Sequence, residues 1–214
     1  MSKRDLRHAR RDYNLGELRR ADLDRDPFVQ FANWFEDAEH PEAVDPTAMF
    51  LATATAEGEP ALRTVLLKHF DHAGFCWYTD KRSDKGRQLE ANPRAEILLY
   101  WPELARQVRI AGPVEHLPMT EAETYFHSRP LDSRFSAASS VQSAVIESRA
   151  VLEARLADLQ RAFPLGDVPR PEAWGGYRLI PQRFEFWQGR PNRLHDRFRY
   201  HLVAGAWEID RLSP

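Results

Sequence analysis

The chain has 214 residues, of which 43% are hydrophobic and 29% are charged, and these values exclude a collagen-like, mucin-like or wholly disordered chain. Its length fits one domain with a sizeable buried core better than it fits two. The 30 basic and 32 acidic residues leave a net charge of −2, which excludes the overall positive field of a general nucleic-acid binder.

The first 27 residues are dense in charge and offer little apolar surface to bury. We therefore expect residues 1–27 to form a mobile arm that orders only against another surface, and residues 28–214 to form a single domain. A helix is predicted from Pro27 to about His40, because apolar residues recur there at a spacing of three to four. These residues are Phe28, Phe31, Ala32, Trp34 and Phe35.

Short runs typical of β-strands dominate the rest of the chain, at 48–55, 61–68, 74–79, 95–101, 107–111, 177–180, 183–187, 200–203 and 206–209. Helices are expected between them: one over 83–91 with Ser83 as N-cap, and one that opens with a capping box at Thr120 and Glu123. A longer helix is predicted from the apolar stripe of Val145, Ile146, Leu152, Leu156, Leu159 and Phe163. Consecutive antiparallel strands with inserted helices predict an α+β fold, a closed or nearly closed barrel that protects its strand edges.

Several classes of site are excluded by what the sequence lacks. No apolar stretch approaches the ~18 residues of a membrane helix, and residues 1–27 lack the apolar core of a secretory signal, so we expect a cytoplasmic protein. Cys76 is the single cysteine, which excludes an intrachain disulfide and a thiolate zinc cluster and favours a core role. His69 and His72 have no companions at metal-ligand spacing, so no metal site is predicted.

Basic and hydroxylic residues at strand ends and helix starts are the remaining candidates for chemistry. Arg63 and Lys68 lie on opposite faces of an otherwise apolar strand. A cation there is unfavourable unless it has an acidic partner or faces a ligand. Lys85 follows the Ser83 cap of a helix whose free N–H groups favour a phosphate, although N-capping alone also explains Ser83.

A second cluster of basic residues follows Trp187. Arg193, His195 and Arg197 alternate along the chain, so in an extended segment their side chains would share one face. Like charges placed together favour an anionic ligand such as a phosphorylated ring. The alternative is a nucleic-acid patch with interleaved aromatic side chains, which the net charge disfavours.

Several motifs, in the same order, resemble those of the pyridoxine/pyridoxamine 5′-phosphate oxidases. They are Arg63–Lys68, Phe126–Pro130, Gln142–Ser143, Trp174–Tyr177, Glu185–Gly189, Arg193–Phe198 and Trp207–Pro214. The resemblance runs from about Arg11 to the last residue. It implies an FMN-binding split β-barrel of mainly antiparallel strands with flanking helices, acting as a homodimer with FMN at the subunit interface.

The resemblance also implies a role for individual positions. The flavin contacts of the family fall on Arg63, Thr64, Val65, Leu66, Leu67, Lys68, Tyr78, Thr79, Lys85, Gln107, Gln142, Ser143, Trp187 and Arg197. The substrate phosphate is expected at Lys68, Tyr125, Arg129 and Ser133, with the catalytic pair Arg193 and His195 over the pyridine ring. Arg11 and Tyr13 match an arm that closes over the substrate, which gives the charged N-terminus the role of a lid.

The implied reaction moves a hydride from C4′ of pyridoxine or pyridoxamine 5′-phosphate to N5 of FMN, with reoxidation by O₂ to give H₂O₂ and release of pyridoxal 5′-phosphate. Two alternatives on the same barrel are a flavin- or vitamer-binding protein without turnover and a nicotinamide-dependent flavin reductase. The retained Arg193 and His195, together with a second phosphate site at Tyr125 and Arg129, argue against both. One departure is Asp84, which stands where the family usually has Arg and removes an expected cation beside the flavin phosphate.

Overall fold

The computed structural model describes residues 5, 7, 13–40 and 43–214. The chain divides into two units, each of which is described by itself. Unit 1 comprises residues 1–46, 98–110 and 182–214, and unit 2 comprises residues 47–97 and 111–181. Two strands, β5 (Arg94–Trp101) and β6 (Arg106–His116), contribute to both units.

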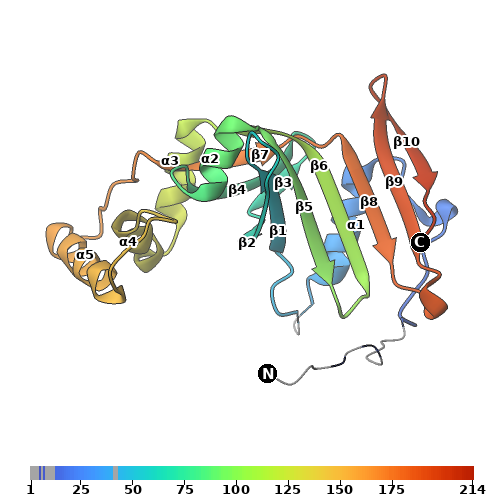
Figure 1. Ribbon diagram of the computed structural model, residues 1–214, viewed down its shortest axis with the longest axis horizontal. Coiled ribbons are helices and arrows are strands. Elements are labelled where there is room, and N and C mark those ends of the chain that lie inside the picture. The colour runs from blue at the N-terminus through green and yellow to red at the C-terminus, as the bar shows by residue number, and fades with distance from the viewer. Residues whose placement is uncertain (1–4, 6, 8–12, 41–42) are drawn as a thin grey trace. The chain divides into compact units, whose positions relative to one another are not determined.

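Unit 1 is an antiparallel sheet with one α-helix, in the strand order β10-β9-β8-β6-β5 (Figure 1). Its own elements are η1 (Arg20–Asp22), α1 (Pro27–Ala38), β8 (Arg183–Gln188), η2 (Pro191–Arg193), β9 (Asp196–Val203) and β10 (Ala206–Arg211). Helix α1 begins where the Asp26 carboxylate accepts from the Phe28 N–H at 2.8 Å. Its predicted apolar face is buried at Phe31 and Trp34, and Trp34 packs edge-on against Phe186 of β8.

The N-terminal segment has more to bury than its charge density suggests. Leu18 is 4% exposed and Leu23 is 8% exposed. The Leu18 N–H donates to the Asp196 carboxylate at 3.1 Å, and the Tyr200 hydroxyl donates to the Asp24 carbonyl at 2.7 Å. Residues 13–27 therefore contact the rest of unit 1 through Leu18 and Leu23, although most residues of this segment are exposed. Arg11 lies outside the described residues. The role of this segment as a lid stays a prediction.

Unit 2 carries two groups of strands, β2-β1-β5 and β3-β4-β7-β6, with four helices. Its own elements are β1 (Ala48–Ala54), β2 (Pro60–Leu66), β3 (His69–Asp71), β4 (Gly74–Asp80), α2 (Asp84–Ala91), α3 (Met119–Ser128), α4 (Leu131–Ser139), α5 (Arg149–Ala162) and β7 (Trp174–Leu179). Strand β4 is buried along most of its length. Cys76 belongs to this core, as predicted, and burial raises the pKa of its thiol to about 11.

Two expectations about the helices fail, and one helix was not anticipated. Helix α3 begins at Met119 with Pro118 as N-cap, so Thr120 caps nothing and Glu123 binds Arg170 and His127 instead. Helix α5 begins only at Arg149, and Val145, placed in its apolar stripe, is fully exposed. Helix α4 was not anticipated, because its sequence is largely polar and Phe135 is its one buried residue.

The observed strands agree with the predicted ranges to within a few residues, except that β6 is longer than predicted and β3 was not predicted. No helix among the described residues is long and apolar enough to cross a bilayer.

Candidate active site

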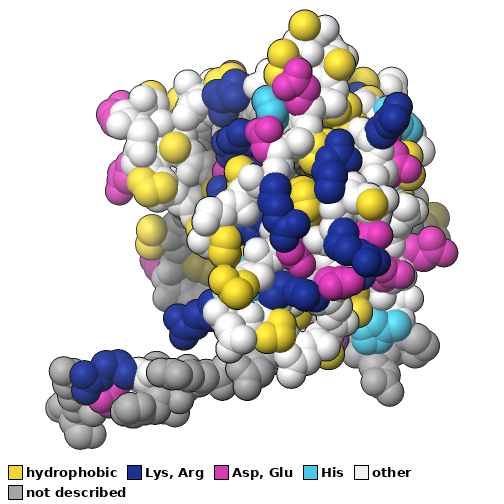
Figure 2. All heavy atoms as spheres, turned by 90° about the vertical axis from the view of Figure 1, so that its right-hand side faces the viewer, with side chains coloured by type: hydrophobic (Ala, Val, Ile, Leu, Met, Phe, Trp, Pro, Cys, Tyr) yellow, Lys and Arg dark blue, Asp and Glu magenta, His cyan; other side chains and the backbone are white. Residues whose placement is uncertain are grey.

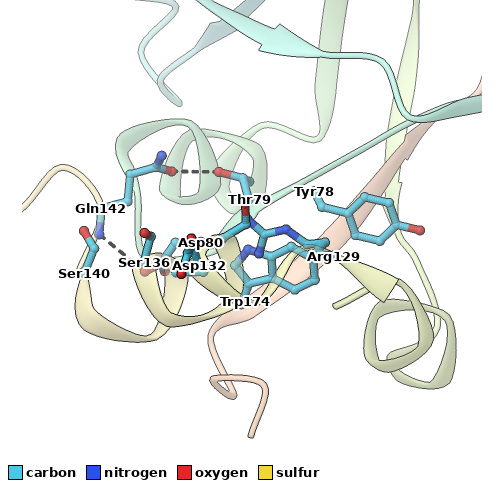
Figure 3. Close-up of a pocket in the computed structure, with 11 residues that line it drawn as sticks. Tyr78, Thr79, Asp80, Arg129, Asp132, Ser136, Ser140, Gln142 and Trp174 are labelled. Atoms are coloured by element: carbon cyan, nitrogen blue, oxygen red, sulfur yellow. Dashed lines mark hydrogen bonds between the residues drawn. The ribbon is translucent and has the colours of Figure 1, made fainter. Parts of the chain in front are cut away.

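A cavity of about 440 Å³ lies within unit 2. It is lined by Thr64, Val65, Leu66, Lys68, Tyr78, Thr79, Lys85, Tyr125, Arg129, Pro130, Ser133, Gln142 and Trp174. All of these except Pro130 and Trp174 are positions that the sequence placed in the site. An adjoining cavity shares the side chains of Tyr78, Thr79, Arg129, Gln142 and Trp174 (Figure 3). The structure therefore brings together residues from β2, β4, α2, α3, α4 and the segment after α4.

Three cations and no carboxylate are among the described residues that line the first cavity. Lys85 is the most buried of these cations, at 7% exposure. Its Nζ lies 2.9 Å from Gln142 Oε1, 3.3 Å from Thr79 Oγ1 and 3.4 Å from Ser83 Oγ. Burial, followed by the charge of Arg63, lowers the pKa of Lys85. An ammonium held by neutral acceptors alone is poorly compensated, so an anion bound here would stabilise it.

Arg129, at the junction of α3 and α4, is a second cation of the cavity that has no acidic partner among the described residues. Its guanidinium lies 5.0 Å from the centre of the Trp174 ring and 5.8 Å from that of Phe126. Nη1 is buried and has no hydrogen-bond partner among the described residues. Burial lowers the pKa of the guanidinium. A buried N–H group without an acceptor is unfavourable by ~1–3 kcal/mol, and a phosphate oxygen would supply the acceptor.

Arg63, Leu67 and Ser143 line neither cavity. Arg63 binds Thr53 Oγ1, Gln88 Oε1 at 3.0 Å and the Leu51 carbonyl at 3.1 Å, all of which are neutral. Leu67 is buried. The Ser143 hydroxyl accepts from the Asp84 N–H at 3.2 Å. The acidic partner that could have explained Arg63 is therefore not found, because the polar groups of β1 and α2 bind it instead.

Aromatic rings form one wall of the cavity. The Tyr78 ring stacks on Tyr125 with centroids 4.1 Å apart and on Trp174 with centroids 5.4 Å apart. In Figure 3, Tyr78 and Gln142 lie on opposite sides of the pocket, and the Tyr78 hydroxyl points away from its polar residues. That hydroxyl donates to Glu121 Oε1 at 3.4 Å. No role in the site is predicted for Trp174 from the sequence, although the Trp-Gly-Gly motif that begins β7 is one of the motifs that carry the resemblance.

Asp84, which departs from the family pattern, lies in the first turn of α2 and is exposed. Ser83 is the N-cap, as predicted, and its hydroxyl accepts from the Gly86 N–H at 3.3 Å. The Asp84 side chain is 62% exposed and forms an ion pair with Arg87. Arg82 forms an ion pair with Asp80 at 2.7 Å. Although burial opposes it, hydrogen bonding to Arg82 lowers the pKa of Asp80.

The remaining predicted residues, Gln107, Trp187, Arg193, His195 and Arg197, belong to unit 1. The Tyr13 ring packs edge-on against the Trp187 ring, with their centroids 5.6 Å apart, and the centroid of the His195 ring lies 4.8 Å from that of Trp187. His195 Nδ1 accepts from the Arg190 N–H at 3.1 Å, which places the proton of the neutral ring on Nε2. Burial, followed by the charge of Arg193, lowers the pKa of His195.

The prediction that Arg193, His195 and Arg197 share one extended face is wrong. Asn192 and Arg193 have φ angles of 55° and 62° in a left-handed turn, and β9 begins only at Asp196. Arg197 is already paired, because its Nη2 lies 2.8 Å from Glu185 Oε1. The like-charge argument for an anion therefore does not hold for this trio, whereas Lys68, Lys85 and Arg129 of the unit 2 cavity have no acidic partner among the described residues.

The face over β9 and β10 does not carry a uniformly basic patch. Figure 2 shows Lys and Arg side chains there interspersed with Asp and Glu side chains. Arg199 is paired with Asp210 at 2.5 Å, and Arg211 is paired with Asp196. Mixed charges of this kind give no support to the nucleic-acid alternative.

Comparison with known families gives two matches. Residues 36–161 match the family described as pyridoxamine 5′-phosphate oxidase, and residues 174–214 match the pyridoxine 5′-phosphate oxidase C-terminal dimerisation region. A pyridoxine/pyridoxamine 5′-phosphate oxidase of Rippkaea orientalis is 48% identical over 98% of this chain and 100% of its own. One of Deinococcus deserti is 50% identical over 98% of this chain and 99% of its own.

Two solved structures are similar in fold. PhzG of Burkholderia lata, in complex with tetrahydrophenazine-1-carboxylic acid, has a TM-score of 0.85 and 32% identity, and the match covers 91% of this chain and 95% of PhzG. An FMN-binding protein of Nostoc punctiforme related to pyridoxamine 5′-phosphate oxidase has a TM-score of 0.71 and 19% identity, with 90% of this chain and 100% of that protein covered. The predicted fold class, an α+β split β-barrel, is confirmed.

Proposed function

Because the chain belongs to the pyridoxine/pyridoxamine 5′-phosphate oxidase family, we propose that it oxidises pyridoxine 5′-phosphate and pyridoxamine 5′-phosphate to pyridoxal 5′-phosphate with FMN as cofactor. The observation that carries this proposal is the cavity of unit 2, whose described lining holds Lys68, Lys85 and Arg129 without a carboxylate. Substrate and cofactor each bring one phosphate. A cavity with several uncompensated cations beside stacked aromatic rings suits two phosphorylated planar ligands.

The residues present fit a flavin phosphate and a substrate phosphate. The buried Lys85 and the amide of Gln142 would hold FMN, together with Thr79 and the β2 residues Thr64–Leu66. Lys68, Tyr125, Arg129 and Ser133 would hold the substrate phosphate, since Arg129 has a buried Nη1 in need of an acceptor. When bound, FMN would supply the redox chemistry, a two-electron oxidation at C4′ of the substrate with O₂ as the final acceptor, reduced to H₂O₂. With pyridoxamine 5′-phosphate, water would also be consumed and the amino group released as ammonia.

The chain's own contribution is binding and orientation. Fixing the substrate by its phosphate restricts the ring to one pose, and this alone accelerates a bimolecular transfer. We assign Arg193 and His195 to the pyridine ring, where neutral His195 can donate from Nε2 because Nδ1 accepts from Arg190. Gln107, Trp187 and Arg197 are assigned to the flavin, at the subunit interface of a homodimer. The dimerisation region matched by residues 174–214 supports this assembly.

The test is a visible spectrum of the FMN-loaded protein before and after anaerobic addition of pyridoxine 5′-phosphate. Bleaching of the flavin bands, reversed by air with formation of pyridoxal 5′-phosphate, is the expected result. Pyridoxine without its phosphate serves as the control and should leave the spectrum unchanged. A bound flavin that stays oxidised with the phosphorylated substrate would instead favour a binding protein, or a reductase if a nicotinamide donor then bleaches it.

A further inference from the structure

The Trp-Gly-Gly motif at the start of β7 has no role in the function proposed above. We propose that Trp174 is a positioning residue: its ring holds the Arg129 guanidinium so that Nη1 faces the substrate phosphate. This inference rests on the proposed function and adds a determinant of its selectivity for phosphorylated substrates. Trp174 touches Arg129 and acts through it.

The Trp174 ring is held firmly in unit 2. It is 7% exposed and packs edge-on against Phe126 of α3 at 5.2 Å. Its backbone is fixed on both sides, because the Trp174 N–H donates to the Pro171 carbonyl at 2.9 Å and the Trp174 carbonyl accepts from Arg170 Nη1 at 2.5 Å. A ring fixed in this way can restrain a neighbouring side chain.

Arg129 has no acidic partner among the described residues, and Trp174 is the nearer of the two aromatic rings that its guanidinium faces. No carboxylate of the described residues forms an ion pair with Arg129, although Asp132 lies three residues away and lines the adjoining cavity with it. The guanidinium instead lies 5.0 Å from the Trp174 centroid, within the range of a cation–π interaction. Figure 3 shows the guanidinium of Arg129 beside the Trp174 ring within the pocket.

The second glycine of the motif, Gly176, leaves room for the Tyr78 ring against the Trp174 ring. Gly176 pairs with Tyr78 across β4 and β7. A Cβ at Gly176 would lie 2.7 Å from Tyr78 Cε1 and 2.5 Å from Leu117 Cδ1. Only glycine lets the Tyr78 ring lie against β7 and stack on Trp174, with an angle of 10° between the rings. The motif therefore builds both the aromatic wall and the support for Arg129.

The test uses Trp174→Leu and Trp174→Phe in the FMN-loaded protein. Leu should raise KM for pyridoxamine 5′-phosphate by about tenfold, equivalent to ~1.4 kcal/mol, which is within the range of a desolvated cation–π pair. Measured at saturating FMN, kcat should stay within about threefold. Phe retains an aromatic ring that gives a weaker cation–π interaction, so it should give an intermediate KM. Trp207→Leu, in unit 1, is the matched control and should leave KM unchanged.

Direct binding separates this inference from the proposed function. Trp174→Leu should raise the Kd for pyridoxal 5′-phosphate by about tenfold, as it does KM. The Kd for pyridoxal, which has no phosphate, should stay unchanged. In an Arg129→Gln background, Trp174→Leu should change the Kd less than twofold, because the ring then has no guanidinium to hold. Equal losses in both backgrounds, or equal losses for both ligands, would overturn the inference. A wild-type protein that binds but does not oxidise its ligand would overturn only the proposed function.

Discussion

Replacement of the buried Lys85 by Met separates stability from cofactor binding. Each neutral partner of the ammonium has a second hydrogen bond: Thr79 Oγ1 donates to Gln142 Oε1 at 2.7 Å, and Ser83 Oγ donates to the Asp80 carbonyl at 2.7 Å. Removing the ammonium therefore leaves no partner unsatisfied, and an apolar side chain of similar length removes a desolvated charge. We expect the unfolding free energy of the FMN-free variant to lie within ~1 kcal/mol of wild type, or above it.

The same replacement should weaken FMN binding by about 50-fold, since a hydrogen bond to a charged group contributes ~1.5–3 kcal/mol. At 100 times its Kd, FMN stabilises the wild type by ~2.7 kcal/mol, which raises the melting temperature by roughly 5–10 °C for a chain of this size. At the same FMN concentration the variant gains only ~0.6 kcal/mol, or roughly 2 °C. Thermal unfolding with and without FMN measures both quantities.

Lys81→Met is the matched control, because Lys81 lies four residues earlier and lines neither cavity. Its FMN-induced shift should equal that of the wild type. A Lys85→Met protein that loses more than ~3 kcal/mol without FMN, or that keeps the full FMN shift, would show that Lys85 is a structural residue and not a phosphate ligand.

The pH dependence has a definite sign. Burial lowers the pKa of Lys85 in the folded state below its ordinary value of 10.5. The unfolded chain then binds more protons, so this group destabilises the fold fully below the lowered pKa and ceases to do so as pH rises toward 10.5. The unfolding free energy of Lys85→Met minus that of wild type should therefore decrease as pH rises through this window. A difference that is independent of pH would contradict the buried charge.

Three further outcomes are expected. Arg193→Ala should lower turnover with pyridoxine 5′-phosphate while flavin content stays nearly intact, and unchanged steady-state kinetics would remove Arg193 from the site. Asp84→Arg should tighten FMN binding only about two- to fivefold, less so at high salt, because position 84 is exposed and paired with Arg87; a titration without any gain would mean that this side chain points away from the phosphate. Gly176→Ala should displace the Tyr78 ring and raise the Kd for FMN. The control is Gly58→Ala at an exposed turn, where the φ of +87° makes the substitution strained but no side chain lies near, and it should raise the Kd less. Equal Kd values for the two variants would show that the Tyr78 stack does not support the flavin.

The sequence predicts the strands well because each is a short apolar or β-branched run that a turn residue ends. It fails where tertiary contacts decide. Helix α4 carries Phe135 as its buried residue and has little periodicity to detect. The stripe assigned to α5 includes Val145, which is fully exposed before the helix begins. Apolar spacing shows that a face exists, but it does not show whether another element covers that face.

The candidate site was found in part by residue chemistry and in part by resemblance. An apolar strand with Arg63 and Lys68 signals unusual cations, but only the fold shows that Arg63 binds neutral groups of β1 and α2. The positive φ at Arg193 could not be read from the sequence, since glycine or asparagine is the usual signal for that conformation. Trp174 was missed because the predicted strand covers 177–180, whereas β7 begins three residues earlier, at Trp174 itself.

The distribution of acids explains how the cavity keeps its cations unpaired in a chain with 32 acidic residues. The carboxylates on the surrounding elements are bound to other groups: Asp80 to Arg82, Asp84 to Arg87, Glu121 to His69 and Tyr78, and Glu123 to Arg170 and His127. Each of these pairs contributes little to stability where it is exposed. Because they are paired in this way, none of these carboxylates forms an ion pair with Lys68, Lys85 or Arg129 in the described part of the chain. Asp132, which lines the adjoining cavity, has no such partner among the described residues. It also forms no ion pair with Arg129, although both residues line that cavity.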